Sequence, residues 1–466
     1  MTTKKILLAS VLFAAPAFAQ DAATATRAEK PVLTDSVEKP AASKKALLYK
    51  AQTIQYMRFN DQRGINIFEA PKQEGVPFTG FKLDWGAAFT QQFQGLNHLN
   101  TADSVRTSAT SAVNANRLIP VGHGFNNAVA NLYLNAQLAK GIRVAMTSYL
   151  SARHHNETWV KDGYFLIDDT PIDFAPLNAL MKFVTVKAGH FEINYGDQHF
   201  RRTDNGQGLY NPLVGNLLMD AFTTQVGGEV YARKAGFLAM GAVTNGEVRG
   251  MVLNPGKRGP AFMGKLGWDG QVTPDLRVRL TGSAFSQNRS ANQTLYTGSR
   301  AGSRYYNMLE NSASTEAANA WSGDVRPDFN EMHAQVVNPF LKYRGLEYFG
   351  NFEKATGRTA AEQLANKTTP TDARKVTHIA NELTYRFLGD ALYLTGRTNS
   401  AKGRFLSSLT DDVTVKRNQI GGGWFITPTV ELKGEYVKQT YTGFPSTDIR
   451  NGGQFKGFMI EGVVSF

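Results

Sequence analysis

The sequence predicts an all-β protein, a transmembrane antiparallel β-barrel of 16 strands with long external loops and short periplasmic turns. Three observations predict this fold class. Apolar and polar residues alternate with a period of two from residue 80 onward, so one face of each strand lies in an apolar medium and the other in water. No apolar run after residue 19 is long enough for a transmembrane helix. Tight turns alternate with long polar loops.

The composition agrees with this fold and excludes several other classes. Of the 466 residues, 19% are charged, 11% are aromatic and 44 are Gly. The mean hydropathy of −0.31 is too low for a bundle of membrane-spanning helices. The chain has no Cys, which excludes disulfides, Cys-ligated zinc, iron–sulfur clusters and thiol catalysis.

Residues 1–19 have the layout of a secretory signal peptide. Lys4 and Lys5 precede an apolar stretch at 6–15, and Ala17-Phe18-Ala19 forms a cleavage site with small residues. We expect cleavage after Ala19. The mature chain then has 49 basic and 39 acidic residues and a formal charge of +10. Residues 20–79 are expected to form a periplasmic leader, whose first 30 residues are rich in Ala, Lys, Pro and Thr.

Residues 80–466 are predicted to form the barrel. Very short links, such as Lys140-Gly141 and Arg344-Gly345, alternate with long polar segments such as 95–126, which is the pattern of outer-membrane barrels. The even count of 16 agrees with a final strand that ends in the periplasm. Sixteen strands enclose an aqueous lumen. The expected strands are 81–94, 127–139, 141–154, 157–168, 182–195, 222–234, 236–246, 260–271, 275–287, 333–344, 346–357, 376–388, 391–402, 413–426, 429–442 and 455–466.

The last strand carries a further indication. Its apolar residues share one face, and the chain ends at Phe466. A final strand that ends in Phe resembles the signal by which the outer-membrane assembly machinery recognises its clients. We therefore expect the protein to lie in the outer membrane of a Gram-negative bacterium, in contact with lipid and lipopolysaccharide.

The plan resembles that of the trimeric 16-stranded porins, and within them the phosphate-selective porin O and P type. Segments 58–72 (RFNDQRGINIFEAPK), 89–96 (FTQQFQGL) and 196–205 (GDQHFRRTDN) suggest such a relative. The resemblance implies a homotrimer that conducts small hydrophilic solutes or anions by passive diffusion. It does not identify the solute, because the family's phosphate-binding residues cannot be aligned one by one.

Residues that alternate with the apolar positions are expected to line the lumen. Arg is a permanent cation suited to phosphate and carboxylate, and basic residues favour anions in a pore. The alternative is that these charges pair with one another across neighbouring strands. The basic candidates are Arg143, Arg153, Arg233, Arg277, Arg279, Arg386, Arg397 and Lys433, and the acidic ones are Glu229, Glu382, Glu431 and Glu435.

Segment 196–221 is the third external loop in this count. The resemblance implies that this loop folds into the barrel and narrows it, and its apolar second half fits inward folding. Arg201 and Arg202, with Asp197 and Asp204 nearby, are the candidates for a constriction that orients a solute. The alternative is that the apolar part packs on a neighbouring loop or subunit.

Two further segments are less well defined by the sequence. Residues 288–331 form the longest loop, with a helix expected within 305–321. Residues 58–72 precede the barrel and are either a periplasmic appendage or a segment that enters the lumen.

No enzymatic, metal or cofactor chemistry is predicted. His154 and His155 are adjacent on a strand and point to opposite faces, so they do not form a metal pair. No catalytic, nucleotide-binding or zinc-protease motif is present, and no nucleic-acid partner is expected. The competing hypotheses are a substrate-specific channel of another outer-membrane class and an adhesive surface barrel with a blocked lumen.

Overall fold

The structure is a computed structural model. The chain divides into two compact units, 1–44 and 45–466, and all described residues belong to the second. The predicted signal peptide and most of the predicted leader lie outside the described residues. The structure describes residues 54, 57–69, 78–106, 108, 110, 113–151, 158–170, 172–248, 252, 254–302, 305–312 and 321–466.

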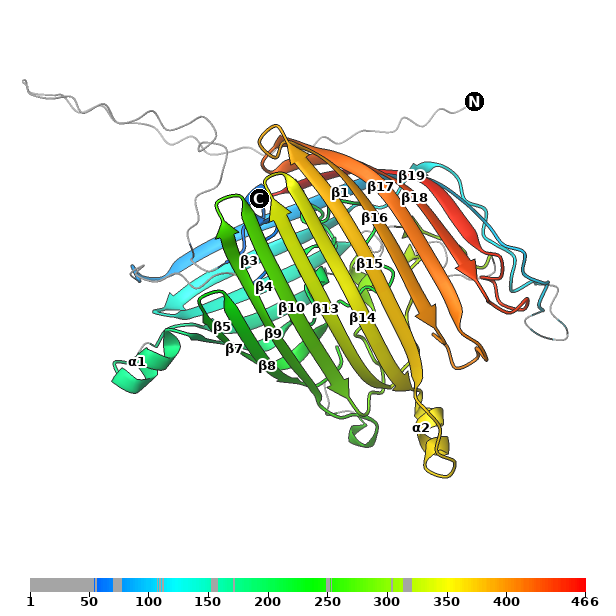
Figure 1. The fold of residues 1–466 in the computed structure, drawn as a ribbon, viewed down its shortest axis with the longest axis horizontal. Helices are drawn as coiled ribbons and strands as arrows, with labels where there is room; N and C mark the ends of the chain where they lie inside the picture. Colours follow the sequence, from blue (N-terminus) through cyan, green and yellow to red (C-terminus); the bar gives the residue numbers. More distant parts are fainter. Residues whose placement is uncertain are drawn as a thin grey trace, which may run out of the picture. The chain divides into compact units, whose positions relative to one another are not determined.

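The described residues form a closed antiparallel barrel (Figure 1). Each long strand pairs with its neighbours in sequence, and β1 pairs with both β3 and β19, which closes the sheet. A two-residue strand, β2 (Gly124–Phe125), also pairs with β1. The 16 long strands are β1 (Lys82–Leu99), β3 (Val129–Ala139), β4 (Ile142–Ser151), β5 (Thr158–Ile167), β6 (Val184–Glu192), β7 (Thr224–Lys234), β8 (Phe237–Thr244), β9 (Ala261–Thr273), β10 (Leu276–Gln287), β13 (Glu331–Tyr343), β14 (Leu346–Arg358), β15 (Arg374–Phe387), β16 (Leu392–Gly403), β17 (Val413–Thr427), β18 (Val430–Thr442) and β19 (Gln454–Ser465).

The predicted fold class is confirmed. Each of the 16 expected strands corresponds to one long strand of the barrel, and the largest difference at a strand end is five residues, at the end of β1. The reason for this agreement is that each strand has one face outside the barrel and one inside, so its period of two is unbroken along most of its length.

The two faces of the strands differ as a membrane barrel requires. On β15, Ile379, Leu383 and Tyr385 point outward and are about half exposed, whereas Glu382 and Arg386 point inward and are at most 5% exposed. Other strands repeat this pattern. An apolar outer face with a polar interior is the arrangement of outer-membrane barrels, in which every strand edge is paired.

The connections at the two ends of the barrel differ in length. Most turns at one end have two residues, and the longest of them holds helix α1 (Ala175–Met181). The other end carries the long loops and helix α2 (Ala360–Asn366) (Figure 1). This helix begins with a capping box between Thr359 and Glu362. No helix among the described residues is long and apolar enough to cross a membrane.

One expected element is contradicted where the structure describes it. The helix predicted within 305–321 is absent from residues 305–312, where β11 (Tyr305–Tyr306) pairs with β12 (Trp321–Ser322). Residues 313–320 lie outside the described part of the chain. The two tyrosines are extended because each is buried inside the barrel, at 0% and 7% exposure, which favours a strand pair over a solvated helix.

The seam between β1 and β19 gives a test of the closure. The backbone of Phe466 exchanges two hydrogen bonds with Ala87, and a Cβ on Gly86 would lie 2.3 Å from the carbonyl oxygen of Phe466. We expect Gly86→Val to cost about 1–3 kcal/mol through overpacking. The variant should lose its compact, unboiled mobility on a denaturing gel at a lower temperature than the unmodified protein.

Gly282→Val is the matched control, because a Cβ at Gly282 meets no atom within 4 Å. This variant should keep the transition temperature of the unmodified protein. Equal losses in both variants would contradict the closure argument.

Candidate functional site in the barrel lumen

A segment of 26 residues folds into the barrel after β6 and is called here the inner segment (196–221). Its residues are buried, except for His199, Phe200 and Asp204, which are partly buried. Polar side chains of the wall bond to its backbone. Lys433 Nζ donates to the carbonyl oxygens of Gly208 and Asn211, at 2.6 and 2.8 Å. The inner segment therefore lies against the inside of the barrel wall.

Strands β16 to β18 hold the inner segment through further charged groups. Glu435 Oε2 accepts the N–H groups of Val214 and Gly215, at 2.9 and 3.0 Å. Arg397 donates to the carbonyl oxygen of Gly215 at 2.7 Å. Arg417 donates to the carbonyl oxygen of Asn216 at 2.6 Å. A segment without regular structure has no strand or helix partners for its backbone N–H and C=O groups. These wall side chains supply hydrogen-bond partners for them.

The apolar part of the inner segment packs on the long loop that follows β10. Val214, Leu218 and Met219 belong to one buried cluster with Leu295 and Met308 of that loop. Their exposure is 0 or 1% in every case. The same cluster includes wall residues of β6 to β10 and of β13 to β19, among them Met240 and Val336.

The residues before β1 also enter the lumen; residues 57–69 are called here the N-terminal segment. Arg58 donates to the carbonyl oxygen of Phe200 at 2.7 Å and lies 3.6 Å from the ring centre of Tyr210. Asn66 Nδ2 donates to Glu347 at 2.7 Å. Of the two alternatives left open by the sequence, these contacts fit a segment inside the barrel. Residues 70–72 lie outside the described part.

Glu69 fixes the other end of the N-terminal segment. Its carboxylate lies 2.9 Å from Lys265 Nζ and 2.8 Å from Arg279 Nη2. Burial by itself would raise the pKa of Glu69, but the charges of Lys265 and Arg279 bring that pKa below its ordinary value. Glu69 is therefore ionised at neutral pH, and both cations remain paired.

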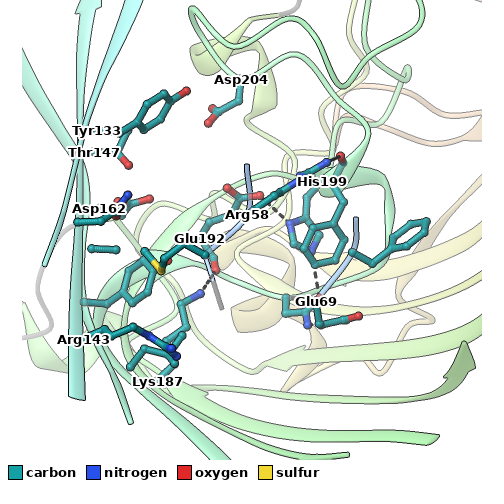
Figure 2. A pocket seen from close by; sticks show the side chains of 18 of the residues that line it. Arg58, Glu69, Tyr133, Arg143, Thr147, Asp162, Lys187, Glu192, His199 and Asp204 are labelled. Atoms are coloured by element: carbon teal, nitrogen blue, oxygen red, sulfur yellow. Dashed lines mark hydrogen bonds and ion pairs between the residues drawn. The ribbon is translucent and has the colours of Figure 1, made fainter. Parts of the chain in front are cut away.

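A polar cavity of about 280 Å³ remains between these two segments and strands β3 to β7 (Figure 2). Aromatic side chains, including Tyr133, Tyr164 and Tyr210, share the lining with charged groups. Six cations line it: Arg58, Arg143, Lys161, Lys187, Arg202 and Arg233. Five carboxylates line it: Glu69, Asp162, Asp168, Glu192 and Asp204. The lining has one formal positive charge in excess, with His199 taken as neutral.

The four predicted constriction residues separate into two pairs. Arg202 and Asp204 line the cavity, with 3.6 Å between Arg202 Nη1 and Asp204 Oδ1, and Arg202 also pairs with Asp220 at 2.6 Å. Arg201 instead points to the wall, 2.6 Å from Glu382. Asp197 accepts from Arg279 and lies 2.7 Å from Lys265. Arg201 and Asp197 thus hold the inner segment and do not line the cavity.

The predicted lumen cations that the structure describes are all on the inner face, but only Arg143 and Arg233 line the cavity. The others are paired and lie beneath the inner and N-terminal segments. The ion pairs include Arg277 with Asp269, Arg279 with Asp197, Arg386 with Glu347, Arg397 with Glu382, and Lys433 with Glu461. Arg153 lies outside the described residues.

Sequence reasoning missed Lys161 and Asp162, which both face the cavity although they are adjacent on β5. The pairing of β4 with β5 shifts there, from Thr147↔Asp162 to Ser148↔Val160, so Lys161 is the extra residue of a β-bulge. A bulge changes the side to which a residue points. The feature of the sequence that could have indicated this bulge is the pair of adjacent charged residues in an otherwise apolar strand.

No cluster of metal ligands was found among the described residues, and His154 and His155 lie outside them. His199 is the histidine of the cavity. Its Nδ1 lies 2.6 Å from Glu192 and its Nε2 lies 3.0 Å from the side-chain oxygen of Asn194. Burial lowers the pKa of His199, and the hydrogen bond and charge of Glu192 act in the opposite direction.

Comparisons with known proteins find similar solved structures only. No protein-family model and no curated protein matches the chain. An anion-selective porin from Comamonas acidovorans is 9% identical, with a TM-score of 0.47, over 83% of this chain and 100% of that one. The outer-membrane channel DcaP of Acinetobacter baumannii is 8% identical, with a TM-score of 0.46, over 84% and 99%. OmpF of Salmonella typhi, in complex with daunomycin, is 11% identical, with a TM-score of 0.46, over 83% and 97%.

Proposed function

We propose that the protein is a porin-type channel of the outer membrane, through which small hydrophilic solutes diffuse passively with a weak preference for anions. The observation that carries this proposal is the polar cavity inside a closed barrel with an apolar outer face. Six cations and five carboxylates line that cavity. Polar groups of both signs hold water and admit hydrated solutes, whereas one excess positive charge biases the passage toward anions.

The preference is weak because the lumen cations are largely paired. Arg143 lies 2.6 Å from Asp168, and Lys161 lies 2.7 Å from Asp204. A paired cation presents little net field to a passing ion. A specific preference for phosphate would need several cations that converge on one point without carboxylates, so phosphate is only one of the anions proposed.

A second candidate is a structural or adhesive surface barrel with a blocked lumen. The observation that favours it is the apolar cluster formed by the inner segment and the long loop, in which Val214 and Leu218 are fully buried. Because this cluster fills part of the lumen, the proposed path of the solutes lies on the side of strands β3 to β7. The homotrimer implied by the porin resemblance stays a prediction, which cross-linking in outer membranes tests.

Planar-bilayer recording of the purified, full-length protein separates the two candidates. A channel gives stable, ohmic conductance steps, and a tenfold KCl gradient should give a small zero-current potential with the sign of anion preference. A protein that inserts and stays silent would support the blocked barrel. A potential with the opposite sign would leave the channel but refute the anion preference.

Arg202 and Arg201 provide a sharper test, because they are adjacent but only Arg202 lines the cavity. Arg202→Gln removes one lining cation and should shift the zero-current potential toward cation preference. Arg201→Gln should leave that potential near the value of the unmodified protein. Each substitution breaks a buried ion pair, a cost of about 3–5 kcal/mol, so folding of both variants is checked by gel mobility. Equal shifts in both variants would contradict the assignment of Arg202 to the passage.

A further inference from the structure

One turn at the short-turn end of the barrel differs from the others in length and in apolar content. It joins β5 to β6, and its residues 172–183, which include helix α1, are called here the long turn. Four of its large apolar side chains are exposed: Ile172 at 65%, Phe174 at 58%, Leu180 at 54% and Phe183 at 38%. Apolar side chains gathered on an exposed surface mark a contact with another molecule or with a membrane.

Hydrogen bonds hold both ends of this connection at the barrel rim. The N–H of Asp168 donates to the carbonyl oxygen of Gly141 at 3.0 Å, and the N–H of Arg233 donates to that of Phe183 at 2.9 Å. Figure 1 shows α1 projecting from the barrel beside β5. In outer-membrane barrels the short turns lie at the periplasmic end, so the long turn lies at the level of the periplasmic leaflet.

The apolar surface of the long turn continues into the membrane face of the wall. Phe183 lines a groove on the outer face of β7 to β10, together with Phe237, Leu266 and Trp268. The N–H of Phe183 donates to the carbonyl oxygen of Leu180 at 3.0 Å, and residues three apart in a helical turn lie on one face. Lipid that covers the groove therefore also reaches Leu180.

Two lysines flank this apolar surface. Lys182 follows α1 and Lys234 ends β7, and both are exposed. Lys234 Nζ lies 4.8 Å from the ring centre of Phe183. Asp173, the acid of the long turn, accepts a hydrogen bond from Asn178 at 3.0 Å. Ammonium groups beside exposed apolar side chains suit an interface where acyl chains meet lipid phosphates.

We propose that the long turn anchors the barrel in the periplasmic leaflet of the outer membrane. Phe174, Leu180 and Phe183 enter the acyl layer of that leaflet, and Lys182 and Lys234 contact the phosphates of anionic phospholipids. The anchor extends the lipid contact that the outer face of the strands already makes. This inference does not depend on whether the lumen conducts.

The test places a nitroxide spin label at single cysteines, since the chain has no Cys of its own. Full-length Leu180→Cys, Leu280→Cys and Leu364→Cys are reconstituted into vesicles of phosphatidylethanolamine and phosphatidylglycerol. Leu280 is exposed on the outer wall, and Leu364 is exposed on α2, which has seven residues like α1. Labels at positions 180 and 280 should be more accessible to oxygen than to a water-soluble nickel complex, and the label at 364 should show the reverse.

Two results would overturn the anchor. One is a label at position 180 with the same accessibility as the label at position 364, which would place the long turn in water. The other is low accessibility to both reagents, because it would indicate that a second copy of the chain covers the turn in place of lipid.

A second measurement tests the two lysines. A bimane label at position 180 is quenched by spin-labelled phosphatidylglycerol or by spin-labelled phosphatidylcholine, in vesicles of phosphatidylcholine. Half-quenching should need about fivefold less of the phosphatidylglycerol probe. Lys182→Gln with Lys234→Gln should abolish this difference. The matched control, Lys367→Gln with Lys375→Gln, changes two exposed lysines at the other end and should keep it. A difference that survives in the first double variant would overturn the phosphate contacts of Lys182 and Lys234.

Discussion

The rest of the structure depends on one constraint: charged groups on the inner face of the barrel need partners wherever chain segments cover them. An uncompensated buried charge costs several kcal/mol. The inner segment has the complementary problem, because its backbone groups have no regular ladder to join. Lys433 donates to two of its carbonyl oxygens, and Glu435 accepts two of its N–H groups. The wall and the segment therefore satisfy each other, and the barrel keeps charged residues that would otherwise be costly.

This pairing also fastens two chain segments inside the barrel. Strands β15 to β18 direct their charges to the inner segment, and Arg201 adds a bond from that segment to Glu382. Glu69 joins the N-terminal segment to Lys265 and Arg279. Strands β3 to β6 also bond to the inner segment, through Asn131, Lys161 and Glu192, and the polar cavity lies on their side of the lumen. A lumen whose cations are already paired is consistent with a channel of weak selectivity, although the mature chain has a formal charge of +10.

The barrel could be predicted from the sequence because the alternation of residues is a local property of each strand. The same alternation predicted that Arg386 and Arg397 lie on the inner face of the barrel wall. What these side chains contact could not be predicted, because their partners are far away in sequence: Asn66 lies 281 residues from Glu347, which it contacts. Arg201 and Arg202 look alike in the sequence, yet one bonds to the wall and the other lines the cavity. Their difference depends on the path of an irregular segment, which no periodicity describes.

The bulge in β5 shows how the membrane constrains even the lumen. Val160 and Phe165 face outward, at 65% and 52% exposure. In a regular strand, adjacent residues point to opposite faces, so either Lys161 or Asp162 would face lipid. A charged side chain on the lipid face destabilises a membrane barrel, most strongly when it is basic and near the midplane. The extra residue at Lys161 removes this conflict, because the outward register restarts on either side of it. The lost regularity of one strand pair thus lets two adjacent charges lie inside the barrel, where one of them contacts three carboxylates and the other lines the cavity.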